Sequence, residues 1–270
     1  MALKQHFTAF VFGIIGILAF APFSIKPLIL VSYAYLIRTI LFENIHTLKK
    51  LISWSIGYWG FGMSWLIVSV YYYGETSILI SLVIFFLLTL FLTLCFGLPL
   101  IALKYRLFSG KVESKHLKIL SISSLLILFE LSRYYLLNGV PWLIPGTVFL
   151  DTPLHSIYSL VGVTGGSFIV YLIATSIAIL WEHRYKIFFG SLVLFIPIID
   201  KNERTEFDLN VSIIQPSSDP IQKYNLGYKS YIENNILNLI KDTSIESQMI
   251  VLPEAELPYS LNSNDFRQFI

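Results

Sequence analysis

Two acidic side chains near the end of the sequence, Glu254 and Glu256, follow a segment typical of a buried strand. Met249–Leu252 is a short, continuous apolar run, and Pro253 ends it by removing a backbone donor. Active sites of open α/β sheets gather at the carboxyl ends of the strands. We therefore interpret Glu254 as a candidate general base held by a stiff turn, with a solvated loop glutamate as the alternative. We expect Glu256, which lies beyond the strand end, to be exposed.

A second candidate site lies in the middle of the sequence, where Glu130 and Arg133 occur in an apolar stretch. Their spacing places both on one face of a helix. Ionisable groups inside a membrane cost a few kcal/mol each unless they are paired or hydrated. The sequence leaves open a structural ion pair, a polar wall for a lipid head group, and an anchor for the loop that follows. That loop, 137–146, has two prolines and two glycines and presents Trp142, so these three side chains are candidate lipid-binding residues.

The remaining reactive residue types do not form a recognisable site. Cys95 is the only cysteine and lies in an apolar run, which favours a buried hydrophobic role over a nucleophile. Net charge is +2 without a clustered basic face, so nucleic acid is not an expected partner. We predict no metal and no cofactor, because the histidines lack ligand spacing. They are His6, His46, His116, His155 and His183.

Composition indicates a membrane protein. Hydrophobic residues make up 55% of the chain and charged residues 13%, with a mean hydropathy of +0.69. Soluble domains carry about 25% charged residues. We predict about seven membrane helices from apolar stretches near the length of a span, and interpret the first as an uncleaved helix, not a signal peptide, because Pro22 would follow the cleavage site. The stretches are 8–22, 27–42, 51–72, 77–103, 118–137, 154–181 and 186–199.

Charges in the connecting loops predict the orientation of these helices. With the N-terminus inside, the inner segments carry most of the cations, as the positive-inside rule requires. Residues after about 200 are then expected outside the cytoplasm. The inner cations are Lys4, Lys49, Lys50, Lys104, Arg106, Lys111, Lys115, Lys118, Arg184 and Lys186, and the outer loops carry Lys26, Glu75 and Asp151.

The last part of the sequence predicts the start of an α/β domain. A polar linker, 200–207, precedes an alternating strand pattern at 209–213. An amphipathic helix is expected at 221–241, before the second strand at 249–252. The sequence thus predicts two domains, a transmembrane domain at 1–200 and a β-α-β unit within 201–270.

Four parts of the sequence, in order, resemble bacterial apolipoprotein N-acyltransferase, a membrane enzyme family of the nitrilase superfamily. The most specific is Glu130-x-x-Arg133 followed by the proline- and tryptophan-containing loop. The resemblance covers nearly the whole chain. Its parts are 18–23, 57–65, 130–146, and the pair 211–215 and 253–258.

The resemblance implies a fold, a reaction and a location. The C-terminal residues would be the incomplete start of a nitrilase-like α/β domain on the periplasmic side of the bacterial inner membrane. The family moves an acyl chain from a phospholipid to an enzyme cysteine, then to the N-terminal cysteine of a diacylated apolipoprotein. Of the family's Glu, Lys and Cys, only the Glu has a counterpart, Glu254. Leu252 and Tyr134 depart from the family's usual Trp and Gly.

Several functional alternatives remain open at this stage. We expect no acyl transfer from these 270 residues alone, because the family's Lys, Cys and final span have no counterpart in them. A second polypeptide supplying those groups would make the chain one half of a split enzyme. A non-catalytic lipid-binding or transporter-like membrane protein is the third alternative, although the sequence shows no convincing internal repeat.

Overall fold

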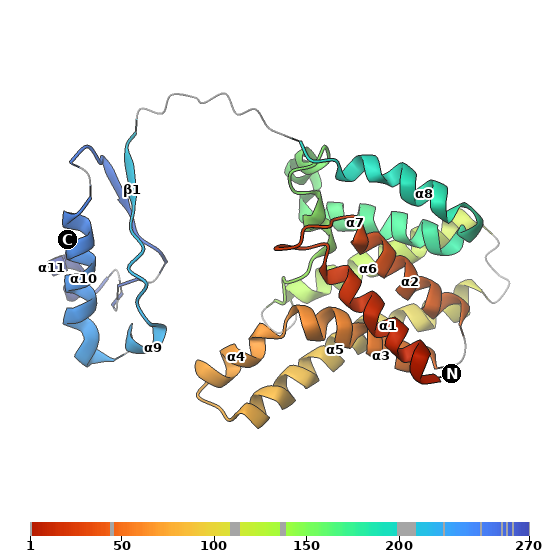
Figure 1. Cartoon of the computed structure of the whole chain (residues 1–270), viewed down its shortest axis with the longest axis horizontal. Helices are drawn as coiled ribbons and strands as arrows, with labels where there is room; N and C mark the ends of the chain where they lie inside the picture. Colours follow the sequence, from red (N-terminus) through yellow and green to blue (C-terminus); the bar gives the residue numbers. More distant parts are fainter. Residues whose placement is uncertain are drawn as a thin grey trace. The chain divides into compact units, whose positions relative to one another are not determined.

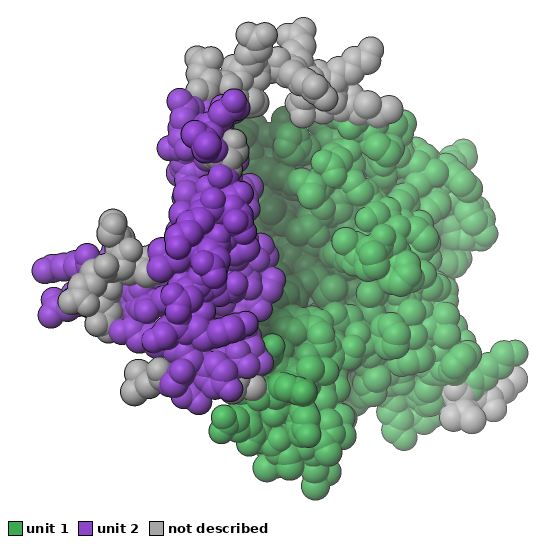
Figure 2. Space-filling view, turned by 60° about the vertical axis from the view of Figure 1, so that its left-hand side comes forward, with its two compact units in different colours: residues 1–199 green, residues 200–270 purple. Residues whose placement is uncertain are grey.

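The computed structural model describes residues 2–43, 46–108, 114–135, 139–198, 209–223, 225–243, 245–254, 256–257, 259–260 and 262–269. The chain divides into two compact units, Met1–Ile199 and Asp200–Ile270, shown in green and purple in Figure 2. We call them the helical unit and the C-terminal unit and describe each by itself. The predicted linker 200–207 lies outside the described residues.

The helical unit is a bundle whose helices follow the apolar stretches of the sequence (Figure 1). Short 3₁₀ segments occupy the connection before α7 and flank α8. The elements are α1 (Ala2–Ile17), α2 (Leu28–Phe42), α3 (Thr47–Ser55), the π-helix η1 (Ile56–Gly60), α4 (Trp65–Tyr72), α5 (Ile78–Leu107), α6 (Lys115–Tyr135), η3 (Pro145–Phe149), η4 (His155–Ile157), α7 (Tyr158–Ile179), η5 (Trp181–His183), α8 (Arg184–Ser191) and η6 (Leu192–Phe195).

Two segments of the described chain are long and apolar enough to cross a membrane by themselves, Ile78–Leu107 and His155–Ile179. A bent pair, Thr47–Gly60 with Trp65–Tyr72, would make a third if it counts as one span. α2 is apolar but shorter. The structure thus supports a membrane protein, while the number of seven spans stays a prediction.

The apolar stretch 51–72, expected as one membrane helix, is broken into two helices that could still form one bent span. α3 and α4 are bent by 64° at a break that follows the π-helix η1. Glycines in this segment let α1 and η1 approach closely, because a Cβ on Gly57 would lie 2.2 Å from the Phe10 carbonyl oxygen and one on Gly13 would lie 2.2 Å from that of Trp54. The bend between α3 and α4 thus has a local cause, since π-helical turns and glycines are common at sharp helix bends.

Aromatic rings fill the centre of the helical unit. Trp54, Trp59 and Tyr58 are fully buried and come from α3 and η1. Trp54 stacks on Tyr58 with ring centroids 4.8 Å apart, and Tyr33 of α2 meets Tyr171 of α7 edge-on at 5.3 Å. These contacts join four separate segments and stabilise the packing by dispersion and burial.

The C-terminal unit has two short parallel strands joined by helices, which fits the start of an α/β domain. Val211 pairs with Met249, and Ile213 pairs with Val251. The predicted helix 221–241 is divided into three segments, and Ile232 and Ile236 are its buried apolar residues. The elements are β1 (Val211–Ile213), α9 (Pro220–Lys223), η7 (Leu226–Tyr228), α10 (Lys229–Lys241), β2 (Met249–Val251) and α11 (Asn264–Phe269).

Candidate functional site

Arg133, in the last turn of α6, holds the loop that follows this helix. Its guanidinium Nη2 donates hydrogen bonds to the carbonyl oxygens of Val140, at 2.7 Å, and Trp142, at 2.5 Å. The amide of Val140 donates in return to the Arg133 carbonyl, at 2.9 Å. The Arg133 side chain is buried, with 4% of its surface exposed. Of the roles that the sequence left open, the geometry supports the loop anchor.

The possible ion pair between Glu130 and Arg133 is not formed in the described structure, where neither residue takes part in a salt bridge. Glu130 is buried and accepts a hydrogen bond from the Tyr171 hydroxyl at 2.9 Å. Side chains three apart share a helix face, but each of these finds a different partner. Glu130 therefore links α6 to α7, and Arg133 links α6 to the loop.

The same loop is held from two further helices. The hydroxyl of Tyr58 donates to the Leu143 carbonyl at 3.1 Å. On α7, Ser167 Oγ accepts the Gly146 amide at 2.8 Å, and the Tyr158 hydroxyl donates to the Gly146 carbonyl at 2.5 Å. A Cβ on Gly146 would lie 2.0 Å from a backbone carbonyl oxygen of α7, so this close approach requires glycine.

Trp142 lies on this anchored loop and remains partly accessible, with 39% of its surface exposed. Its ring meets Trp65, at the start of α4, edge-on at a centroid distance of 5.1 Å. We use the name anchored loop for residues 139–146. The structure thus brings Arg133 to the backbone of Trp142, whose ring stays partly exposed while the guanidinium is buried. Asn138 and the residues just before it lie outside the described residues.

Glu254 lies in a turn three residues beyond β2, and its side chain is exposed. The parallel pairing continues past β1, where the Ile214 amide donates to the Val251 carbonyl at 3.0 Å. The segments after β1 and after β2 therefore leave the sheet side by side at its carboxyl edge. Glu254 follows β2 at this edge and is exposed.

The expectation that Glu256 is exposed is wrong. Glu256 has 4% of its surface exposed, because the segment after β1 covers it. Its Oε1 accepts from Ser218 Oγ at 2.5 Å, and its Oε2 pairs with Lys223 Nζ at 3.0 Å. Glu256 therefore ties the two segments together and positions the turn that carries Glu254. These partners are 33–38 residues away in sequence, so no local pattern signals them.

In the part of the chain that the structure describes, no group of three or more His, Cys, Asp or Glu side chains is arranged to hold a metal ion. Cys95 lies within α5, away from both candidate groups in the sequence, and is partly buried. Cys95 and Glu254 belong to different compact units.

Comparison with known proteins assigns the helical unit. Residues 12–176 match the family model described as the apolipoprotein N-acyltransferase N-terminal domain. The chain belongs to this family. The match runs from α1 to the last turn of α7 and includes Glu130, Arg133 and the whole anchored loop.

Curated relatives named apolipoprotein N-acyltransferase extend the similarity into the C-terminal unit. The chain is 27% identical to the protein of Haemophilus ducreyi over 93% of its length, 26% to that of Pasteurella multocida over 94%, and 27% to that of Haemophilus influenzae over 95%. These matches cover 50%, 50% and 51% of the three relatives. The chain therefore spans about half the length of the curated relatives that it matches, and the resemblance found in the sequence is confirmed.

Proposed function

We propose that the protein containing these residues transfers an acyl chain from a phospholipid to the N-terminal cysteine of apolipoproteins that already carry an S-diacylglyceryl group. The family match across the helical unit is the observation that carries this proposal. The reaction takes place at the bacterial inner membrane, with the helical unit crossing it several times and the C-terminal unit on the periplasmic side. Apolar helices and the distribution of loop cations support this placement.

Within this function, Glu254 is the general base that accepts the proton of the nucleophile. Its exposed position at the carboxyl edge of the β1–β2 pair supports the role, because a base must reach its substrate. The anchored loop presents Trp142 to the lipid, and Arg133 acts through the loop as a positioning residue. Glu130 fixes α6 against α7 beneath it.

The nucleophile and the oxyanion-stabilising cation of the family are proposed to come from outside these 270 residues. The chain's one cysteine, Cys95, lies in an apolar helix. A second polypeptide or a longer chain would supply the missing groups, and reading the DNA that follows codon 270 would separate these cases. The 270 residues alone are accordingly expected to transfer no acyl chain.

Mass spectrometry of a reporter lipoprotein tests the proposal. The complete protein is supplied to cells depleted of their own N-acyltransferase, in parallel with Glu254→Gln, Glu256→Gln and the 270-residue chain. We expect triacylated reporter from the complete protein and a rate about 10²–10⁴-fold lower for Glu254→Gln, the usual contribution of a general base. Diacylated reporter from the complete, folded protein would overturn the proposed function. Triacylated reporter from the 270 residues alone would overturn only their proposed inactivity.

A further inference from the structure

A cavity of about 750 Å³ lies in the helical unit between α2 and the segment after α7 that contains η5 and α8. Ligand pockets in proteins have volumes of this order. Its lining includes two arginines, Arg38 and Arg184, the indole of Trp181, and the apolar rings of Phe12 and Phe189. Guanidinium groups and aromatic rings therefore meet in one concave place.

The two guanidinium groups converge on Trp181. The Arg38 Cζ lies 3.9 Å from the centroid of the Trp181 ring, and the Arg184 Cζ lies 4.6 Å from it. Each arginine also donates one backbone hydrogen bond, Arg38 to the Ala178 carbonyl at 3.1 Å and Arg184 to the Trp181 carbonyl at 2.8 Å. These contacts fix both groups in place before any ligand arrives.

Neither arginine forms a salt bridge within the described residues, although the Glu43 carboxylate lies near enough to Arg38 to attract its charge. The salt bridges there join Lys50 to Glu43 and Lys223 to Glu256. Glu43 is the carboxylate that lines the cavity, and Lys50 engages it. A guanidinium has five N–H donors, so both groups keep donors for an anion. Planar, bidentate donors of this kind suit phosphate oxygens.

The surroundings of the cavity are apolar and accessible. Phe42, Tyr185 and Phe189 have 46%, 62% and 63% of their surfaces exposed. These rings lie at the helix ends, where aromatic side chains meet the membrane interface. A lipid that binds here can therefore place its anionic group against the arginines and its apolar chains against the exposed rings.

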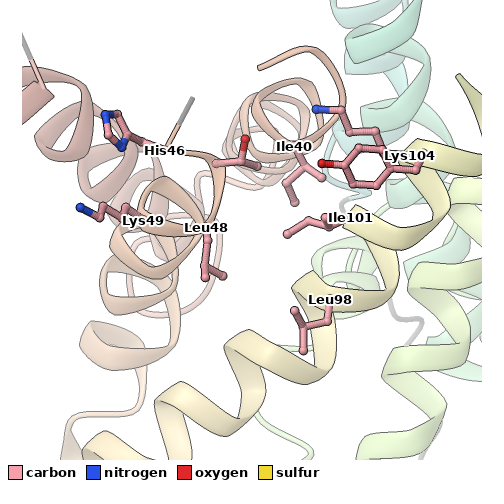
Figure 3. Close-up of a pocket in the computed structure, with 9 residues that line it drawn as sticks. Ile40, His46, Leu48, Lys49, Leu98, Ile101 and Lys104 are labelled. Carbon is pink, nitrogen blue, oxygen red and sulfur yellow. The ribbon is translucent and has the colours of Figure 1, made fainter. Parts of the chain in front are cut away.

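A second cavity, of about 490 Å³, lies at the same end of α2 and differs from the first in how its cations are arranged (Figure 3). Its apolar lining includes Leu98 and Ile101 of α5, Ile40 of α2 and Leu48 of α3. The ammonium group of Lys49 points away from Leu98 and Ile101 in this view. Lys104 is 9% exposed and donates to the Glu43 carbonyl at 2.7 Å. This second cavity therefore lacks a pair of convergent cations, and Lys49 serves as a matched control.

We infer that the cavity between α2 and α8 binds an anionic phospholipid, with the phosphate between Arg38 and Arg184 and the acyl chains along the exposed rings. The site lies at the end of α7 that is remote from the anchored loop, which contacts α7 through Tyr158 and Ser167. The positive-inside distribution assigns this end to the cytoplasmic leaflet. The bound lipid is therefore distinct from the acyl donor, and its role is to hold α2 against α8.

Native mass spectrometry of the 270-residue chain, released from neutral detergent, tests this inference. Dioleoyl-phosphatidylglycerol is titrated against dioleoyl-phosphatidylcholine, with the wild type, Arg38→Gln/Arg184→Gln, Arg38→Lys/Arg184→Lys and Lys49→Gln. We expect one retained phosphatidylglycerol and an affinity at least about tenfold lower for the glutamine variant, because charge-assisted hydrogen bonds are lost. The lysine variant keeps part of the affinity, and Lys49→Gln stays within about twofold of the wild type, as for an exposed charge.

Three results would overturn the inference. Equal retention of phosphatidylcholine by the wild type would show that the phosphate site has no preference for anionic lipid. An equal loss in Lys49→Gln would indicate general surface charge. Displacement of the lipid by an equal concentration of inorganic phosphate would indicate a site for free anions. The first and third comparisons use only wild-type protein, so they decide the matter even where the glutamine variant does not fold.

Discussion

Replacing Arg133 by methionine should release the anchored loop while the rest of the bundle stays folded. The substitution keeps an unbranched side chain in the buried site and removes the two hydrogen bonds to the carbonyl oxygens of Val140 and Trp142, which are 2.7 and 2.5 Å long. Glu130 keeps its own partner, Tyr171, so the contact between α6 and α7 is retained.

The magnitude follows from the burial of these groups. Hydrogen bonds to a charged group contribute about 1.5–3 kcal/mol each. The hydrogen bond to Val140 is buried, whereas the one to Trp142 is partly buried. Water can therefore bind the Trp142 carbonyl in the variant and offset part of the free energy lost with that hydrogen bond. A total near 3 kcal/mol in the opening free energy of the loop is expected, which corresponds to roughly a hundredfold change in an equilibrium constant.

Hydrogen exchange with mass spectrometry measures this opening directly, because amide exchange reports local unfolding. The amide of Val140 is bonded in the wild type and should exchange about a hundredfold faster in Arg133→Met, whereas the amide of Gly146, which Ser167 of α7 holds, should change less. Ser132→Ala, one residue away on α6, is the matched control and should leave them unchanged. Exchange that is unaltered in residues 139–146, or faster by the same factor throughout the bundle, would refute the role of Arg133 as the loop's anchor.

Two further substitutions test the packing. Gly57→Val should lower the stability of the helical unit by about 1–3 kcal/mol, because the new side chain would meet a backbone carbonyl of α1. Gly190→Ala, where a Cβ would have nothing within 4 Å, should not lower it. Thermal melting in detergent compares the two variants, and equal melting midpoints would contradict the close approach at Gly57. Glu256→Gln should destabilise the C-terminal unit by about 1–2 kcal/mol, because it weakens the contact with Lys223, whereas Glu254→Gln should leave the stability of this unit unchanged. Hydrogen exchange in the β1–β2 region measures both effects. A larger effect of Glu254→Gln would contradict the structural role given to Glu256.

The sequence predicted several of the helices well because apolar stretches and their ends are local features, but the stretch 186–199 contains only the short helix α8 and the 3₁₀ segment η6. The positions of α2, α5, α6 and α7 follow from hydropathy and loop signals, and the two parallel strands follow from short apolar runs. The bend between α3 and α4 was missed. Its signal was the run of glycines at 57, 60 and 62, which hydropathy alone reads as a continuous helix.

The candidate site was harder to predict because its partners are distant in sequence or belong to the backbone. The spacing of Glu130 and Arg133 places them on one helix face. It does not show whether they pair with each other or bind other groups, such as a tyrosine on α7 or the loop carbonyls. The burial of Glu256 depends on Ser218 and on how the segment after β1 covers the sheet edge. Such contacts are fixed by the fold and have no local pattern.

Cysteine labelling in intact cells tests most directly whether the C-terminal unit faces the side where the proposed reaction occurs. In a Cys95→Ser background the chain has no other thiol, so a single cysteine can be placed at Ile245, which is fully exposed, or at the exposed Lys49. A membrane-impermeant maleimide should label Ile245→Cys in intact cells and Lys49→Cys only after permeabilisation. Labelling of Lys49→Cys before permeabilisation, with Ile245→Cys protected, would place Glu254 in the cytoplasm and contradict the account.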